Sequence, residues 1–323
     1  MRGEMIQQVG ARVWGRRAMA WQWALPLTVV ALVVILALLN PRFATPSNLL
    51  NLTRQAAILT ILAMGELFPI LGGGFDFSIG ATVASAGMVS AFTASKVGLV
   101  PGFLAGIFMG GVVGTVNGFI VARFRVSPFV VTLAMYSVLR GMGLMITGGA
   151  PIRDVPAGYT ALGAGLLGPV PVPILIAMVL LGGCYFLLRR TRPGRCIYLL
   201  GGNEAAAFLA GVNLLRYKTL TYVLCGLLAG FAGVIHSSRL GWGEPNLGLG
   251  TDIDAIAAVI IGGVALTGGI GGVANVIIGV ALLSVLGNGL SVVGVPYYSQ
   301  LMLSGAVILV ALIVNQLAQG RRG

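Results

Sequence analysis

Charged residues are scarce in this sequence. Asp, Glu, Lys and Arg together make up 9% of its 323 residues, whereas hydrophobic residues make up 57%, and the mean hydropathy is +0.98. A chain with so few polar side chains cannot cover its own surface in water, so the composition excludes a water-soluble globular protein. A lipid bilayer is the solvent that such a composition requires.

Histidine, cysteine and lysine are also rare, and each shortage excludes a kind of chemistry. A single histidine, His236, argues against a His-based catalytic centre and against a metal site. Three cysteines without Cys-x-x-Cys spacing provide neither a disulfide framework nor a zinc site. Neither of the two lysines, Lys96 and Lys218, completes a Gly-x-x-x-x-Gly-Lys-Ser/Thr loop for ATP. We therefore expect no catalytic residue, no metal and no cofactor in this chain.

The basic residues lie at the ends of long apolar runs. In a soluble protein the net charge of +12 would suggest nucleic acid, but this placement is the positive-inside pattern of membrane proteins. The apolar runs cover residues 23–39, 49–71, 76–95, 99–121, 127–148, 170–188, 217–236, 252–268, 273–291 and 299–316. With the N-terminus in the cytoplasm, ten spans place fourteen of the twenty Lys and Arg residues on the cytoplasmic side. The sequence thus predicts an all-α, polytopic bundle of about ten spans with both ends in the cytoplasm.

A single transmembrane domain is expected over residues 1–323. Residues 1–22 are basic and precede the first apolar run, which no small-residue cleavage site follows, so we expect a cytoplasmic tail and a retained first span. Residues 189–218 form the longest polar interruption and contain six basic residues. This segment is predicted to be a cytoplasmic loop.

A short helix is predicted inside this loop. Its pattern is an Asn cap, an anion in the first turn, alanines and a terminating glycine, supplied by Asn203, Glu204, Ala205, Ala206 and Gly211. Gly201 and Gly202, just before the cap, are expected to form a turn. A helix of about seven residues is roughly 10 Å long and is not stable alone in water. It must therefore pack on its own protein or on a partner.

Glycine recurs at every fourth residue within the run 99–121. The five positions form a stripe along one helix face, where another helix can approach closely: Gly102, Gly106, Gly110, Gly114 and Gly118. We interpret this stripe as a packing face rather than as a site.

A loose internal repeat relates the two halves of the chain. An Asp-containing, Gly-rich stretch occurs at residues 72–80 and again at 248–254, and an Asn-Gly pair follows each of them, at Asn117 and Asn288. The third apolar run thus matches the eighth, and this odd offset means that the two copies would cross the membrane in opposite directions. Inverted repeats with interrupted segments are typical of transporters, in which the interruptions lie on the substrate path.

Several polar residues lie within or beside the apolar runs, where an ion is costly unless it is paired or hydrated. The candidates for a substrate path are carboxylates, a serine and two aromatic neighbours: Glu66, Phe75, Asp76, Phe77, Ser78, Asp252 and Asp254. Two interpretations stay open. Asp76, Ser78, Asp252 and Asp254 can cap helix starts, where the helix dipole favours an anion, and Glu66 can belong to a structural pair or a hydrated edge. Alternatively, they line a water-filled path and hydrogen-bond a polar solute on which the aromatic rings stack.

Three runs carry a family resemblance, at residues 72–91, 194–213 and 252–273. GGGFDFSIG, which opens the first run, resembles the GGIDLSVG motif of sugar-importing ABC permeases of the ribose, xylose and arabinose type. The resemblance extends from about residue 40 to residue 315. Phe75 and Phe77 depart from the Ile and Leu of that motif, and Glu66 stands where the family tends to have Gln. These departures surround Asp76 and bear on which sugar is carried.

The resemblance implies a permease subunit in the bacterial cytoplasmic membrane that imports a monosaccharide or a related polyol. It also implies that the helix beginning at Glu204 couples to a separate ATPase subunit, which uses ATP and Mg. An extracytoplasmic sugar-binding protein and a second permease copy or paralogue would complete the importer, with no nucleic acid among the partners. The alternatives are an ion-coupled secondary transporter with Asp76 or Glu66 as its coupling carboxylate, an ABC permease for branched-chain amino acids, and a membrane scaffold without transport.

Overall fold

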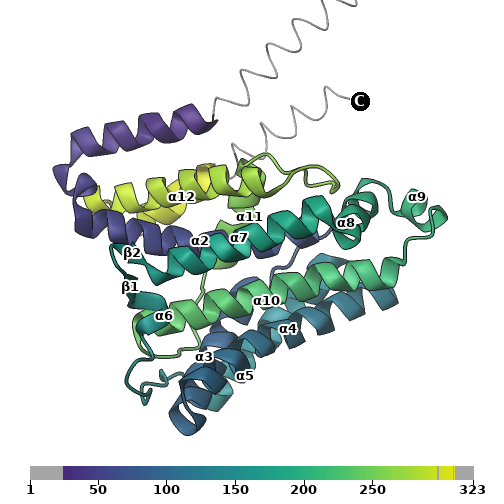
Figure 1. Ribbon diagram of the computed structural model, residues 1–323, viewed down its shortest axis with the longest axis horizontal. Helices are drawn as coiled ribbons and strands as arrows, with labels where there is room; N and C mark the ends of the chain where they lie inside the picture. Colours follow the sequence, from purple (N-terminus) through teal and green to yellow (C-terminus); the bar gives the residue numbers. More distant parts are fainter. Residues whose placement is uncertain (1–24, 297, 308, 310–323) are drawn as a thin grey trace, which may run out of the picture.

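The computed structural model describes residues 25–296, 298–307 and 309, and most of this part of the chain is helical. The long helices run roughly side by side, with the short helix α9 at one end of the molecule, called here the α9 end (Figure 1). The opposite end, called the hairpin end, carries α6 and the antiparallel pair β1–β2 (Figure 1).

The elements follow one another in chain order as Leu25–Leu39, η1 (Pro41–Ala44), α2 (Pro46–Leu71), α3 (Ile79–Val97), α4 (Leu99–Phe124), α5 (Pro128–Thr147), α6 (Ala161–Ala164), β1 (Leu166–Leu167), β2 (Val170–Pro171), α7 (Val172–Arg190), α8 (Arg192–Gly202), α9 (Glu204–Leu209), α10 (Leu214–Leu240), α11 (Thr251–Ile261) and α12 (Val273–Val293). Residues 298–307 are also helical.

Six of the described helices are long and apolar enough to cross a membrane: α2, α4, α5, α7, α10 and α12. Helix α3 has 19 residues but is less apolar, because Ala, Gly, Ser and Thr dominate it. Helix α11 has 11 residues and is roughly 17 Å long, about half of the apolar thickness of a bilayer. The all-α bundle is confirmed. The ten spans and the cytoplasmic position of both ends stay predictions, and residues 1–24 and 310–323 lie outside the described part.

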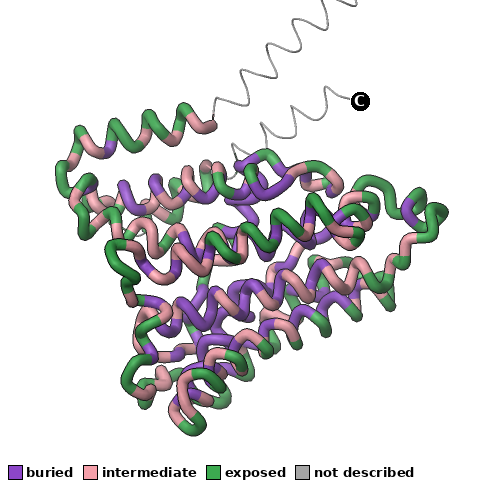
Figure 2. The backbone as a smooth tube through the Cα atoms, viewed as in Figure 1, coloured by how far each residue is buried: buried purple, intermediate pink, exposed green. Residues whose placement is uncertain are grey.

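Helix α10 is central in the bundle, where it packs on α2, α3 and α4. Helices α11 and α12 instead pack on α2. Figure 2 shows long buried stretches on α10, α3 and their neighbours. The first half thus places α3 and α4 on a helix of the second half, and the second half places α11 and α12 on a helix of the first. Such an exchange is what the predicted internal repeat would produce if α2 and α10 were equivalent helices.

The glycine stripe of α4 forms the contact with α10, and it also contacts α3. A Cβ added at Gly110 would overlap the carbonyl oxygen of Gly226 and lie 2.8 Å from Gly230 Cα. A Cβ at Gly106 would lie 2.7 Å from the Ala86 carbonyl oxygen of α3. The prediction of a packing face is therefore confirmed. Backbone atoms of the neighbouring helices fill much of the space that the missing methyl groups leave, together with small side-chain groups such as Val234 Cγ2 at Gly106.

The chain between α10 and α11 returns along α3 through a series of turns. A Cβ at Gly243 would lie 2.9 Å from Met88 Cα, and a Cβ at Gly80 would lie 2.7 Å from the Gly248 carbonyl oxygen. Residues 243–248 therefore follow α3 from Met88 back to Gly80. The predicted apolar run 252–268 is helical only as far as Ile261, so this segment is interrupted on both sides of a short helix.

Gly114 provides a test of the close approach between α4 and α10. A Cβ there would overlap the Tyr222 carbonyl oxygen and lie 2.9 Å from its carbonyl carbon. We expect Gly114→Ala to lower the free energy of unfolding by about 1–3 kcal/mol, because backbone must shift to admit the methyl group. Gly141 in α5 has open space around its Cα, so Gly141→Ala is the matched control. Thermal unfolding of both variants in detergent would contradict this account if they melted at the same temperature.

Candidate functional site

A cluster of buried polar side chains surrounds the connection between α2 and α3. Both carboxylates predicted from this stretch lie in it, since Glu66 is 0% and Asp76 2% exposed. Asp76 Oδ1 accepts hydrogen bonds from the backbone N–H of Ser78 at 2.9 Å and from the Ser78 hydroxyl at 2.5 Å. Glu66 Oε1 accepts from the backbone N–H of Asp76 at 3.0 Å. Two carboxylates ten residues apart thus hold one short piece of non-helical backbone.

Three consecutive amides in this connection donate to side-chain oxygens. The amides of Asp76 and Ser78 donate to Glu66 and Asp76, as above, and the Phe77 amide donates to Thr132 Oγ1 of α5 at 3.1 Å. These amides belong to the non-helical residues just before α3, so no helix supplies their acceptors. Inside a bilayer they cannot use water, so side chains must supply the acceptors. Asp76 accepts from the Ser78 amide in the turn before α3, whereas Ser78, the N-cap residue of α3, makes no side-chain cap hydrogen bond. Asp76 therefore stabilises this turn rather than capping the helix itself, and its place on a substrate path stays a prediction.

Further polar residues from α4 and α10 complete the cluster. Asn117 Nδ2 donates to Ser78 Oγ at 2.8 Å and reaches Asp76 Oδ2 at 3.5 Å. The hydroxyl of Tyr222 donates to the Phe75 carbonyl oxygen at 3.4 Å, and Cys225 Sγ lies 3.8 Å from Glu66 Oε2. None of these three residues was predicted from the sequence to belong to a site. For Asn117 a signal existed, because the internal repeat had marked it together with Asn288.

The two predicted aromatic residues are partly buried beside the cluster. The ring of Phe77 packs edge-on against Phe129 of α5, with 5.2 Å between centroids, and Phe75 lies 6.4 Å from Phe77. Both rings therefore have protein neighbours. Their stacking on a solute stays a prediction.

The structure brings one of the two later carboxylates close to this region. Asp252, in the first turn of α11, lies beside the first turn of α3, because a Cβ at Gly80 would lie 3.5 Å from Asp252 Cγ. Asp254 is exposed on the other side of the same turn. The N-terminal ends of α3 and α11 thus meet inside the bundle, and each carries a carboxylate at its start.

At the α9 end, the predicted short helix is present as α9, six residues long. The Asn203 side chain accepts from the Ala206 amide at 2.9 Å, and Gly211 has the predicted left-handed conformation, with φ of +78°. The prediction of a turn at Gly201 and Gly202 is wrong, because both residues continue helix α8 to its last turn. Asn203 is therefore the only residue between α8 and α9.

Helix α9 makes little contact with its own protein. Ala207 is buried at 2% exposure, but Phe208 is 66% and Leu209 86% exposed, and Ala205 and Ala206 are exposed as well. The sequence left open whether this helix packs on its own protein or on a partner. Its exposed apolar side chains favour a partner.

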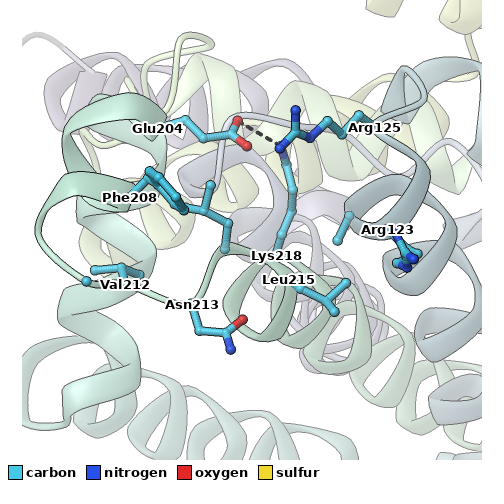
Figure 3. A pocket seen from close by; sticks show the side chains of 11 residues that line it. Arg123, Arg125, Glu204, Phe208, Val212, Asn213, Leu215 and Lys218 are labelled. Carbon is cyan, nitrogen blue, oxygen red and sulfur yellow. Dashed lines mark hydrogen bonds and ion pairs between the residues drawn. The ribbon is translucent and has the colours of Figure 1, made fainter.

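A groove of about 680 Å³ separates α9 from the ends of α4 and α10 (Figure 3). Its lining consists of Ala122, Arg123, Arg125, Glu204, Phe208, Gly211, Val212, Asn213, Leu214, Leu215 and Lys218. Lys218 Nζ pairs with Glu204 Oε2 at 2.9 Å, and Arg125 reaches toward the same ion pair from α4 (Figure 3). Arg125 has a backbone φ of +55°, a conformation that residues other than glycine rarely adopt. The groove is positively charged, because it is lined by three cations, Arg123, Arg125 and Lys218, and by a single carboxylate, Glu204.

Comparison with known proteins identifies the family. Residues 48–312 match the family described as "Branched-chain amino acid transport system / permease component". The chain is 37% identical to the ribose import permease protein of Escherichia coli, over 94% of this chain and 98% of that protein. It is 33% identical to the L-arabinose ABC transporter permease protein of Azospirillum brasilense, over 92% of this chain and 88% of that protein. It is also 33% identical to the D-allose transport system permease protein of Escherichia coli, over 93% of each chain. No solved structure gives a significant match.

These matches cover the buried carboxylate cluster, the chain between α10 and α11, and α9. The chain therefore belongs to this permease family, together with the ribose, arabinose and allose permeases of ABC transporters.

Proposed function

We propose that this protein is the permease subunit of an ABC importer that carries a monosaccharide or a related polyol across the bacterial cytoplasmic membrane. The observation that carries the proposal is the 37% identity to a ribose import permease over nearly the full length of both chains. Six apolar helices agree with a multi-pass membrane protein. The protein is a transport component rather than an enzyme.

The branched-chain amino-acid alternative rests on the printed description of the family. The relatives that match over most of their length are named for ribose, arabinose and allose instead, so the sugar is favoured. An ion-coupled transporter would use the buried carboxylates, but it would leave the exposed apolar surface of α9 without a partner. The departures at Phe75 and Phe77 support a substrate other than ribose itself.

The ATPase subunit is proposed to dock on α9 and in the adjoining groove. Phe208 and Leu209 are large apolar side chains exposed at the end of the molecule, and such surfaces mark protein interaction sites. The positive groove beside them suits acidic side chains of the ATPase. ATP and Mg are used by that subunit, which leaves the permease without a cofactor of its own.

In the proposed arrangement, the α9 end faces the cytoplasm and the hairpin end faces the sugar-binding protein. Ten spans with both chain ends in the cytoplasm follow from the distribution of Lys and Arg. A second permease copy or a paralogue would complete the path, and no nucleic acid takes part. The path itself would pass the meeting point of α3 and α11, because helix starts at interrupted segments are where transporters bind polar solutes.

The first test changes the exposed face of α9. Ala205→Glu combined with Ala206→Glu places two charges where the ATPase would dock, and both positions are exposed, so folding should be unaffected. We expect the ATPase subunit to be lost from the purified complex and sugar uptake to fall at least tenfold, since a desolvated, unpaired charge costs several kcal/mol. The control for ATPase retention is Ala150→Glu combined with Ala157→Glu, which are exposed at the other end, away from the proposed ATPase contact. Full retention of the ATPase in the α9 variant would remove the docking proposal.

The second test concerns topology. In a background without the three native cysteines, Leu209→Cys and Asp154→Cys place thiols at exposed positions of the α9 end and the hairpin end. An impermeant thiol reagent added to intact cells should label position 154 and spare position 209. Labelling of position 209 from outside would overturn the proposed orientation. Lysed cells that lack the ATPase subunit serve as the positive control, because both positions are then uncovered and must react.

The third test asks whether Asp76 contacts the transported sugar in addition to holding the turn before α3. Asn ranks close to Asp as a cap, and its side-chain oxygen can still accept from the Ser78 amide. We expect Asp76→Asn to keep its expression and melting temperature while uptake falls about fivefold, because a hydrogen bond to a charged group weakens by roughly 1 kcal/mol when the charge is removed. Uptake at the wild-type rate would assign Asp76 to a purely structural role.

A further inference from the structure

The last turn of α8 contacts two of the non-helical connections of the bundle. One connection is the segment that follows α2 and leads to Asp76, and the other is the loop 262–272 between α11 and α12. The Gly269 amide of the second connection donates to the Leu71 carbonyl oxygen at the start of the first, at 3.0 Å. Gly201 of α8 packs on both partners of this hydrogen bond. Three segments that are far apart in the sequence therefore meet at one backbone junction.

Only glycine fits at the α8 side of this junction. A Cβ at Gly201 would overlap the Leu71 carbonyl oxygen and lie 2.6 Å from the Gly269 amide nitrogen. On the opposite side, a Cβ at Gly268 would lie 2.9 Å from Gly201 Cα and 3.0 Å from the Gly73 amide nitrogen. All of these neighbours are backbone atoms, which cannot turn aside as a flexible side chain would. Gly202, the next residue, has no atom within 4 Å of its Cβ position.

A second link ties α8 to the same loop. The Tyr198 hydroxyl donates to the Gly271 carbonyl oxygen at 2.9 Å. Burial raises the pKa of Tyr198, so the hydroxyl keeps its proton and remains a donor. Tyr198 lies one turn before Gly201 on α8, so the helix holds the loop at two points.

The connection from α8 to α9 is short enough to transmit movement. Asn203 ends α8 and also caps α9, so no flexible loop separates them. Helix α8 is itself held by Ile197 at 0% and Leu200 at 2% exposure. A displacement of α9 would therefore move the last turn of α8, rather than being absorbed between the two helices.

We infer that Gly201 is a positioning residue for transport: it passes a displacement of α9 to the two connections that border the carboxylate cluster. The inference rests on the proposed function, because it needs a partner that moves α9. It goes beyond docking, since it names the place where α8 acts on the path. The role belongs to the Cα side of Gly201 that faces the junction and not to glycine content, because the Cβ position of Gly202 is open even though its backbone lies beside Gly269.

The test compares Gly201→Ala with Gly202→Ala. Both variants are reconstituted in vesicles with the ATPase and the sugar-binding protein of the same importer, and ATPase binding, ATP hydrolysis and sugar uptake are measured together. We expect Gly201→Ala to bind the ATPase and hydrolyse ATP as the wild type does, while sugar carried per ATP falls roughly tenfold, within the usual range of coupling between sites. Gly202→Ala should match the wild type in all three measurements.

Tyr198→Phe decides the matter if Gly201→Ala does not fold. This change removes only the hydroxyl that donates to Gly271, and it adds no atom to the junction. We expect sugar carried per ATP to fall about threefold, whereas the melting temperature falls by no more than the loss of one partly buried hydrogen bond explains.

Two kinds of result would overturn the inference. In the first, the folded Gly201→Ala variant carries as much sugar per ATP as Gly202→Ala, or Tyr198→Phe keeps the wild-type ratio when Gly201→Ala does not fold. In the second, ATP hydrolysis, ATPase binding and melting temperature of Gly201→Ala all fall together with uptake, which shows a structural role only. A wild-type permease that carries no sugar with its ATPase would instead defeat the proposed function, so the two failures are distinguishable.

Discussion

Every backbone amide inside the apolar part of the bundle needs an acceptor from the protein itself, and this requirement organises the centre of the molecule. Three such amides lie in the turn just before α3, and Glu66, Asp76 and Thr132 supply their acceptors. Carboxylates suit this task because an anion is also favoured by the positive end of the helix dipole. The polar cluster is therefore first of all the means by which an interrupted segment can exist in a bilayer.

The same requirement accounts for the glycines. Non-helical backbone that cannot turn to water must come close to other backbone, and a side chain at the contact would keep the two apart. Gly80 admits the carbonyl oxygen of Gly248. Gly201 admits the carbonyl oxygen of Leu71 and the amide of Gly269 that donates to it. The glycines of α4 do the same for a helix pair. Close backbone contact is thus a common solution in this protein, at helix faces and at interruptions alike.

Local patterns in the sequence were sufficient for some elements. The cap at Asn203 and the left-handed Gly211 predicted α9 to within a residue, because both signals act over a few residues. The stripe on α4 was predicted from its spacing alone. Glu66 and Asp76 were selected because ions are rare in apolar runs, and the structure places them together.

Other features depend on contacts between distant segments, which a single sequence does not display. Tyr222 and Cys225 lie more than one hundred residues from the carboxylates that they approach. They fall in a stretch, 221–235, that resembles the family, but no spacing in it marks them as part of a polar cluster. The Gly201–Gly202 pair looked like a turn because glycine is costly inside a helix, at about 1 kcal/mol per residue relative to Ala. The burial of Ile197 and Leu200 and the tight contact at Gly201 outweigh that cost. In this case tertiary packing overrides the local preference.

The exposed face of α9 sets a bound on what docking can do. Burying Phe208 and Leu209 in a partner would contribute roughly 3–6 kcal/mol, whereas the partly exposed pair of Lys218 and Glu204 contributes less than about 1 kcal/mol. Driving a two-state permease from one state almost fully to the other takes about 5.5 kcal/mol of differential binding. Only the part of the docking energy that differs between the two states can do this. The apolar contacts of α9 can shift the permease between its two states only if the partner buries them in one state and largely exposes them in the other. The ion pair is too weak to replace these contacts. A rigid α8 is then necessary, because a flexible connection would let α9 follow its partner without moving the path.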